Sequence, residues 1–252
     1  MPKANSQKPT ANSKQPIINN KKPKIMTIIE TKNLHKIYKE SEIEVHAVRG
    51  IDLSFEQGEF TAIVGPSGSG KTTFLNMIGG LDKPTEGEIV IDGIKINDLK
   101  GSKLIDFRLR KIGFVFQAYN LIPVLTAKEN VEFIMNLQKR PKKERIERAE
   151  NLLKAVGLGD RLNARPSKLS GGQQQRVAVA RALASKPMFI LADEPTANLD
   201  SESTRNLLDI MENLNKEENI TFIFSTHDSR VVEKARRVIT VDDGKIVSDV
   251  KK

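Results

Sequence analysis

The 252-residue sequence predicts an α/β fold in which a mainly parallel core sheet is flanked by helices. Short apolar runs alternate with helical patterns through the second half of the chain, which is typical of parallel strands joined by helices. A glycine-rich loop joins one apolar run to a helix, and closely spaced strand patterns near the start favour an antiparallel β layer beside the main sheet. A long helical stretch in the middle indicates an inserted α-helical segment.

Strand patterns dominate the first half of the folded region. They begin at Ile28, and apolar residues then alternate at Ile51, Leu53 and Phe55. The sequence further predicts strands at 60–64, 89–91, 94–96 and 112–116, a turn at Asp92–Gly93, and a helix from Lys71 to Gly79–Gly80.

Helical spacing takes over from Thr126 to Leu158. Thr126 and Glu129 form the pattern of a capping box at its start, and Gly157 marks its expected end. Strand–helix alternation then resumes. The predicted elements are a helix ending at Ser185, a strand at 188–192, a helix at 201–216, a strand at 220–224, a helix at 229–236, and strands at 238–241 and 245–247 around Asp243–Gly244.

The net charge of +9 is concentrated at the start of the chain. Residues 1–25 carry six lysines and no acidic residue, and their Asn-, Ser-, Pro- and Gln-rich composition predicts a disordered basic tail. Such a tail is either simply solvated or weakly attracted to anionic lipid, and both alternatives stay open. We expect no specific nucleic-acid partner, because residues 26–252 carry no comparable basic excess and few aromatic residues.

Composition also restricts the chemistry available to the chain. The absence of cysteine excludes disulfides and thiolate metal sites, and the three histidines are scattered, which argues against a structural zinc site. No apolar run approaches the roughly 18 residues that cross a bilayer. The 252 residues are enough for one large α/β domain or two small ones.

A phosphate-binding pattern lies between the strand at 60–64 and the helix that follows it. Residues 65–72 match G-x-x-x-x-G-K-[ST], in which backbone N–H groups and a helix N-terminus face phosphate oxygens. Lys71 is expected to reach the β and γ phosphates, and the Thr72 hydroxyl is expected to bind Mg²⁺. The candidate nucleotide-binding residues are Gly65, Pro66, Ser67, Gly68, Ser69, Gly70, Lys71, Thr72 and Thr73.

Polar residues also follow three other predicted strands, at the sheet edge where ligands bind in open α/β folds. Asp193 and Glu194 come directly after a buried apolar run. Asp193 is expected to hold Mg²⁺, and Glu194 is expected to act as general base toward the attacking water. Gln117 is positioned after its strand to reach Mg²⁺ and the water, and His227 to contact the γ-phosphate and orient the base.

A second glycine-rich element, Leu169-Ser170-Gly171-Gly172-Gln173, opens the helix that ends at Ser185. Ser170 is a good N-cap, and Gly171 and Gly172 allow a ligand to approach the backbone closely. The free N–H groups and the dipole of the helix start favour an anion. One small fold has little room for two such surfaces on one nucleotide, so this element raises a question about assembly.

From about residue 27 to residue 250, these features resemble the ATP-binding cassette (ABC) ATPase family, which has a P-loop NTPase core. The phosphate loop resembles the family's Walker A motif, and residues 189–194 resemble its Walker B motif with a catalytic glutamate. Residues 169–173 are identical to its LSGGQ signature. The resemblance also assigns Gln117 to the Q-loop, His227 to the switch histidine, residues 197–200 to the D-loop, and Tyr38 to an aromatic ring that stacks on adenine.

Within that family, residues 79–87 and 119–123 look most like the lipoprotein-releasing, macrolide-exporting and antimicrobial-peptide-resistance ATPases. The resemblance implies an ATPase that uses ATP and Mg²⁺ and forms a head-to-tail dimer with a second copy. It also implies a core of residues 26–117 and 169–252, and a helical subdomain, 118–168, on which integral membrane permease subunits dock. In the dimer, ATP is held by Walker A of one chain and by Ser170, Gly171, Gly172 and Gln173 of the other.

The implied function is ATP-driven dimerisation that powers export, or extraction from the membrane, by a peripheral subunit at its cytoplasmic face. A non-transport ABC ATPase is the alternative. DNA-maintenance members carry a long coiled coil between Walker A and the signature, whereas Lys71 and Ser170 are only 99 positions apart. Translation members usually carry two cassettes, and this chain has one. A cell-division-associated ATPase that signals to a cell-wall enzyme stays open.

Overall fold

The computed structural model describes residues 26–40 and 43–252, together with Met1. The basic tail predicted for residues 1–25 therefore lies, apart from Met1, outside the described residues. In the described part of the chain, the strands form one six-stranded and one four-stranded sheet. No helix in this part has the length and apolar character needed to cross a membrane.

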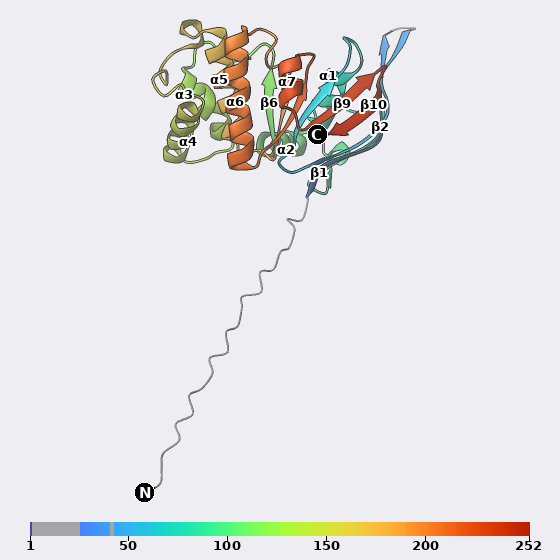
Figure 1. Cartoon of the computed structure of the whole chain (residues 1–252), viewed down its shortest axis with the longest axis horizontal. Helices are drawn as coiled ribbons and strands as arrows, with labels where there is room; N and C mark the ends of the chain where they lie inside the picture. The colour runs from blue at the N-terminus through green and yellow to red at the C-terminus, as the bar shows by residue number, and fades with distance from the viewer. Residues whose placement is uncertain (2–25, 41–42) are drawn as a thin grey trace.

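The six-stranded sheet is the core sheet (Figure 1). Its strands, in spatial order, are β10 (Lys245–Lys251), β9 (Arg237–Asp242), β3 (Phe60–Val64), β8 (Thr221–Ser225), β7 (Phe189–Asp193) and β6 (Ile112–Phe116). Neighbours from β9 to β6 are parallel, and β10 is antiparallel to β9. Strands β3, β7 and β8 are buried almost throughout, as parallel strands covered on both faces are. The mainly parallel core sheet expected from the sequence is confirmed.

The four-stranded sheet is the antiparallel β layer. In spatial order it consists of β2 (Ile43–Glu56), β1 (Thr27–Glu40), β4 (Glu86–Ile91) and β5 (Ile94–Lys95), and every neighbouring pair is antiparallel. The strand predicted at 94–96 ends one residue earlier, because Ile96 begins the short 3₁₀ helix η1 (Ile96–Asp98).

The helices pack around the core sheet. They are α1 (Lys71–Ile78), α2 (Ser102–Lys111), α3 (Ala127–Leu137), α4 (Lys142–Ala155), α5 (Gly171–Ala184), α6 (Ser201–Glu218), α7 (Ser229–Lys234) and the 3₁₀ helix η2 (Pro166–Lys168). The predicted helical stretch is split into α3 and α4, since Pro141 lacks an N–H to donate and disfavours helical backbone at the residue before it. The sequence patterns missed α2, where Phe107 is the one buried residue and the apolar signal is weak.

Helix α1 lies between the two sheets. Its residues Phe74, Leu75, Met77 and Ile78 belong to an apolar cluster that contains side chains of both sheets. A second cluster joins the other face of the core sheet to α3, α4, α5 and α6, which lie at the opposite end of the molecule from β1 and β2 in Figure 1. Because α1 packs against both sheets, its start and the loop that precedes it are fixed from two sides.

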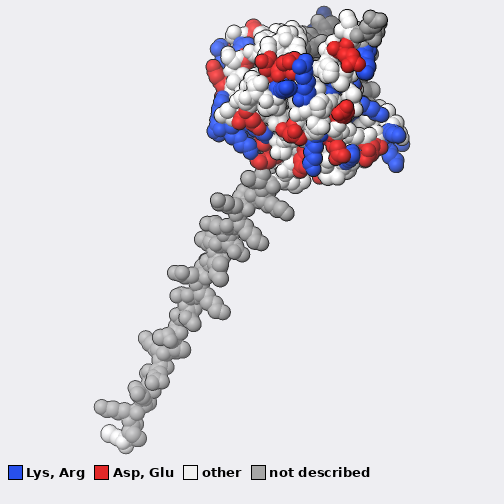
Figure 2. Space-filling view, turned by 90° about the vertical axis from the view of Figure 1, so that its right-hand side faces the viewer, with Lys and Arg blue, Asp and Glu red and all other residues white. Residues whose placement is uncertain are grey.

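Acidic and basic side chains are mixed on the surface. On the face shown in Figure 2, Lys and Arg are interspersed with Asp and Glu. Several basic groups pair with acidic neighbours, as Lys36 does with Asp82 at 2.6 Å.

Candidate functional site

The loops that follow β3, β6, β7 and β8 meet at one edge of the core sheet. Since these strands are parallel neighbours, their carboxyl ends lie side by side, with Asp193 opposite both Phe116 and Ser225. The loops border a cavity of about 890 Å³ that is also lined by β2 and the β9–β10 turn. We call it the phosphate-loop cavity. Its lining residues are Glu44, Val45, His46, Ala47, Arg49, Gly65–Thr73, Gln117, Glu194, Ala197, His227 and Asp243.

The phosphate loop wraps the start of α1 as the sequence predicts. Gly70 is the N-cap of α1 with φ of +100°, and a Cβ there would lie 2.2 Å from the carbonyl oxygen of Ala47, so only glycine fits. The Lys71 side chain is 8% exposed, and its Nζ donates to the carbonyl oxygens of Gly65 and Pro66, each at 2.8 Å. The loop thus holds a cation beside the helix N-terminus, where a phosphate group is bound most favourably.

The donors suited to a divalent cation lie next to this loop. The Thr72 hydroxyl donates to Oδ1 of Asp193 at 3.0 Å, and Gln117 lines the same cavity. These are hard oxygen ligands of the kind Mg²⁺ takes together with phosphate oxygens and water. In the described residues, no three His, Cys, Asp or Glu side chains gather into a metal site of their own. The arrangement fits a Mg²⁺ ion that arrives with a nucleotide.

The carboxylate of Glu194 is held by two groups from the end of β8. His227 Nδ1 lies 2.8 Å from Oε1, a bond in which the ring nitrogen donates because an ionised carboxylate only accepts. The Thr226 hydroxyl donates to Oε2 at 3.3 Å. The backbone of Glu194 has φ of +46° and its N–H donates to the carbonyl of Ser225 at 2.8 Å. A left-handed non-glycine residue tied down at a sheet edge is typical of a functional site.

The signature residues form the start of α5. Ser170 caps the helix: its hydroxyl accepts from the Gln173 N–H at 3.3 Å, while the Ser170 N–H donates to the Gln173 side chain at 2.9 Å. A Cβ at Gly171 would lie 2.8 Å from the Tyr119 hydroxyl, which explains the glycine there. None of residues 170–173 lines the phosphate-loop cavity, and α1 and α5 lie in different halves of the molecule in Figure 1. One chain does not bring the two phosphate-binding elements together.

Tyr38 also lies outside the lining of the phosphate-loop cavity. Its hydroxyl donates to Oδ2 of Asp82 at 2.7 Å, and the Lys36 ammonium sits 4.8 Å from the ring centroid. Burial and the bond to Asp82 raise the pKa of Tyr38, so the hydroxyl stays a neutral donor. Adenine stacking on Tyr38 stays a prediction.

Sequence patterns missed residues that other elements bring to the cavity. Arg49 of β2 pairs with Asp243 of the β9–β10 turn at 2.7 Å, and both line the cavity. His46 also lines the cavity, and the Thr226 hydroxyl donates to the Glu194 carboxylate. Only the Asp243–Gly244 turn had a signal in the sequence. Pairing between two sheets is a tertiary property that a linear pattern does not reveal.

Comparison with known proteins agrees with this geometry. Residues 48–197 match the family described as ABC transporter. The lipoprotein-releasing system ATP-binding protein LolD of Syntrophus aciditrophicus is 45% identical over 88% of this chain and 99% of its own length. The macrolide export ATP-binding/permease protein MacB of Aggregatibacter actinomycetemcomitans is 48% identical over 90% of this chain, a match that spans 35% of MacB.

A solved structure is similar as well. It is the dimeric ATP-binding cassette MJ0796 of Methanocaldococcus jannaschii, in a post-hydrolysis state bound to ADP and Pi. Its sequence is 47% identical to this chain, and the two structures superpose with a TM-score of 0.82. The match covers 89% of this chain and 98% of the MJ0796 chain. The resemblance seen in the motifs and the fold expected from it are thus confirmed. The chain belongs to the ABC transporter family, as an ATP-binding subunit with ATPase activity.

Proposed function

We propose that two copies of this chain hold ATP between them and that its hydrolysis powers transport through integral membrane subunits. One observation carries the proposal. The phosphate-loop cavity contains the loop, Gln117, Glu194 and His227, while the signature residues lie outside it. A head-to-tail second copy would place its α5 start over the open side of the cavity. The solved relative MJ0796, which is described as dimeric, supports this assembly.

The groups of one chain supply most of the hydrolytic chemistry. The loop amides and Lys71 bind the phosphates, and Glu194 accepts the proton of the attacking water. His227, bonded to the same carboxylate, is positioned to contact the γ-phosphate. Mg²⁺, held by Thr72 and Gln117 and through water by Asp193, would neutralise charge on the phosphate oxygens.

The partner chain would complete the site with its signature. The Ser170 hydroxyl, the amides of Gly171 and Gly172, and Gln173 face the γ-phosphate in this arrangement, because the first amides of a helix have no acceptor within it. Each site then needs both chains, so ATP favours the closed dimer, and its conversion to ADP and phosphate favours the open form. We assign the core to residues 26–117 and 169–252 and the helical subdomain to 118–168.

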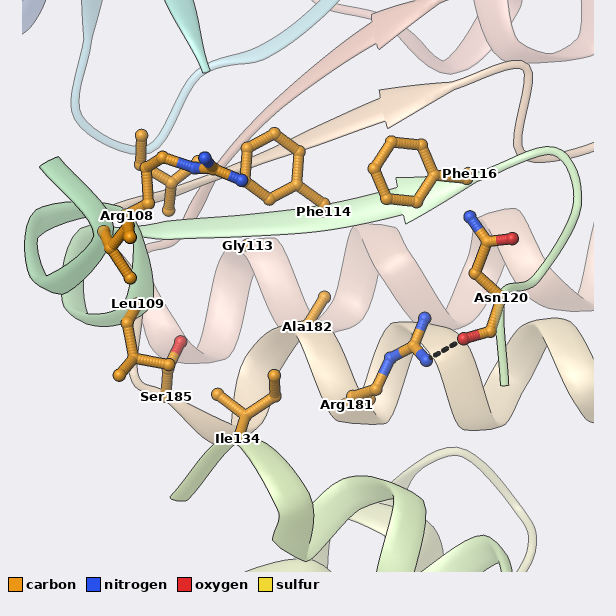
Figure 3. A pocket seen from close by; sticks show the side chains of 12 residues that line it. Arg108, Leu109, Gly113, Phe114, Phe116, Asn120, Ile134, Arg181, Ala182 and Ser185 are labelled. Atoms are coloured by element: carbon orange, nitrogen blue, oxygen red, sulfur yellow. Dashed lines mark hydrogen bonds between the residues drawn. The ribbon is translucent and has the colours of Figure 1, made fainter. Parts of the chain in front are cut away.

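The membrane subunits would dock at a groove between α2, β6, α3 and α5 (Figure 3). The groove has a volume of about 480 Å³ and is lined by the stacked rings of Phe114 and Phe116, whose centroids lie 5.7 Å apart. Ile105 of α2 and Leu137 of α3 are exposed apolar residues on two of these helices. Arg181 in its wall donates to the carbonyls of Tyr119 and Asn120, which fixes the segment after Gln117. Exposed apolar residues around a concave apolar surface are typical of a protein interface.

The remaining proposals concern adenine and the membrane surface. We propose that the Tyr38 ring stacks on adenine and that the chain works as a peripheral subunit at the cytoplasmic face of the membrane. The basic tail, residues 1–25, would add at most a weak contact with anionic lipid. The likeness to LolD and MacB favours export, or extraction from the membrane, as the process that ATP hydrolysis powers.

The shared site is tested with variants that bind ATP but do not turn it over. Glu194→Gln should form a dimer in MgATP, measured by size-exclusion chromatography with light scattering. Adding Gly171→Asp should leave a monomer that still binds nucleotide, because the new charge opposes the partner's γ-phosphate. An aspartate in the first turn suits a helix. Its Cβ would come within 3 Å only of the hydroxyl end of the Tyr119 side chain, which can shift, so the fold should be retained.

The matched control places the same charge at the start of another helix. Ser102→Asp, at the exposed first residue of α2, adds the same charge and should leave the Glu194→Gln dimer intact. The proposal fails if Glu194→Gln stays monomeric in saturating MgATP. It also fails if the Gly171→Asp double variant dimerises as strongly as its parent.

A further inference from the structure

The two partners of the Glu194 carboxylate differ in how firmly they are fixed. The His227 side chain is 75% exposed, so water competes for its bond and its rotamer is free to change. Thr226 is 0% exposed, and no water reaches its hydroxyl. The shorter bond, at 2.8 Å, therefore comes from the exposed group, and the longer one, at 3.3 Å, from the buried group.

The direction of the Thr226 hydroxyl is set by a second bond. Its oxygen accepts from the backbone N–H of Asp228 at 3.0 Å. A hydroxyl has one hydrogen to donate. Because the Asp228 N–H occupies one acceptor position of the Thr226 oxygen, the hydroxyl hydrogen is left to point at Oε2 of Glu194. The buried hydroxyl thus connects the catalytic carboxylate to the start of α7.

Asp228 is itself anchored from two sides. Its carboxylate accepts from the buried Thr196 hydroxyl at 2.8 Å and from Nε and Nη2 of Arg230 at 2.9 and 2.8 Å. Burial alone would raise the pKa of Asp228, but the bonds from Arg230 and Thr196 outweigh it and lower that pKa below the usual range. Asp228 therefore stays charged, and the backbone N–H that orients Thr226 stays in place.

We propose that Thr226 is a positioning residue whose hydroxyl keeps the Glu194 carboxylate in place while His227 leaves it to contact the γ-phosphate. The inference rests on the roles proposed for Glu194 and His227. Without the hydroxyl, Glu194 would lose its placement whenever His227 turns away. Misplacing a catalytic group by about 1 Å costs on the order of 100-fold in rate.

The test compares Thr226, which directly follows β8, with Thr221, the first residue of that strand. Thr226→Val removes the hydroxyl and keeps the shape, whereas Thr226→Ser keeps the hydroxyl. Thr221→Val is the matched control. Thr221 is also 0% exposed, and its hydroxyl accepts from the Gly58 N–H at 2.8 Å and donates to the Glu56 carbonyl at 3.1 Å, at the far end of β8. Steady-state ATPase rates, MgADP affinity and melting temperature are measured for each purified chain.

Thr226→Val should lower kcat about 10-fold or more, with KM for MgATP and MgADP affinity within about twofold of wild type. Thr226→Ser should recover most of kcat, and Thr221→Val should melt earlier yet keep kcat. The inference is overturned if Thr226→Val turns over like Thr221→Val, or if Thr226→Ser is as slow as Thr226→Val. Normal turnover by Glu194→Gln would instead overturn the proposed role of Glu194, so the two failures are distinguishable.

Discussion

The phosphate-loop cavity and the start of α5 both present polar groups suited to phosphate, but they are completed in different ways. At the cavity, groups from separate elements pair with one another: Thr72 of α1 with Asp193, and Glu194 with His227. At α5, Ser170 and Gln173 satisfy only each other, within one helical turn. The cavity is thus built from tertiary contacts, whereas the capping bonds of the signature are local to one helical turn.

In the proposed dimer, this difference explains why assembly would control turnover. A local motif can be presented on the surface and used by another molecule, while a site gathered from four strand ends must stay within one fold. Placing the last phosphate donors on a second copy makes hydrolysis depend on dimerisation. Under this proposal, the chain holds a nearly complete active site that would work only when a partner closes it.

Glu194→Gln gives the largest effect expected and separates the two regions. The amide cannot accept the proton of the attacking water, so kcat should fall about 10²- to 10⁴-fold. The signature is untouched, so MgATP should still close the dimer. Single-turnover phosphate release measures the first effect, and light scattering measures the second.

Glu147→Gln on the exposed face of α4 is the control and should match wild type in both measurements. If Glu194→Gln hydrolyses ATP at the normal rate, the general base lies elsewhere and the cavity is less complete than proposed. If it loses hydrolysis and dimerisation together, the carboxylate also serves the interface, and the separation of the two regions is wrong.

Thr72→Val tests the Mg²⁺ site of the cavity and should have an effect on ATPase activity between those of the other two sets of variants. It removes the hydroxyl that donates to Asp193 at 3.0 Å and that is positioned for Mg²⁺. The Mg²⁺ concentration for half-maximal ATPase should rise about 10-fold or more, since partners of metal ligands typically contribute 10- to 100-fold. Thr72→Ser should restore the wild-type Mg²⁺ titration. An unchanged titration for Thr72→Val would remove Thr72 from the metal site.

The sequence predicted most of the cavity because its residues follow strands directly. A short apolar run indicates a buried strand, and a polar residue one step later must lie at the sheet edge, so Glu194 and Gln117 could be placed without a structure. The capping box of α3 and the Ser170 N-cap of α5 were equally readable, since a cap involves residues only a few positions apart.

Other parts depend on contacts between distant segments and left no such pattern. Helix α2 buries only Phe107, so its sequence resembles a solvated loop. The approach of β2 to the phosphate loop brings Ala47 and Arg49 to the cavity from another sheet. Thr226 could not be distinguished from its neighbours, because its importance comes from bonds to Glu194 and Asp228 that only the folded chain defines.

Arg49 and Asp243 give the smallest effect expected and test where the cavity ends. They are 39% and 69% exposed and pair at 2.7 Å across its rim. The rim is also held by backbone bonds, from the Arg49 N–H to the Gly244 carbonyl at 2.8 Å and from the Gly244 N–H to the Ser69 carbonyl at 3.0 Å. Because exposed ion pairs contribute about 0–1 kcal/mol, Arg49→Gln should change MgADP affinity less than about fivefold.

Calorimetric titration of Arg49→Gln, Asp243→Asn and the double variant checks this expectation. The two single effects should overlap in the double variant, and their coupling should fade as salt is raised, since exposed charges are screened. A loss of more than about 30-fold for Arg49→Gln alone, with Asp243→Asn unchanged, would mean that the guanidinium binds phosphate itself, because a direct charge-assisted bond is worth about 1.5–3 kcal/mol. In that case the antiparallel sheet would contribute to nucleotide binding directly, and the cavity would draw its groups from both sheets rather than from the core sheet alone.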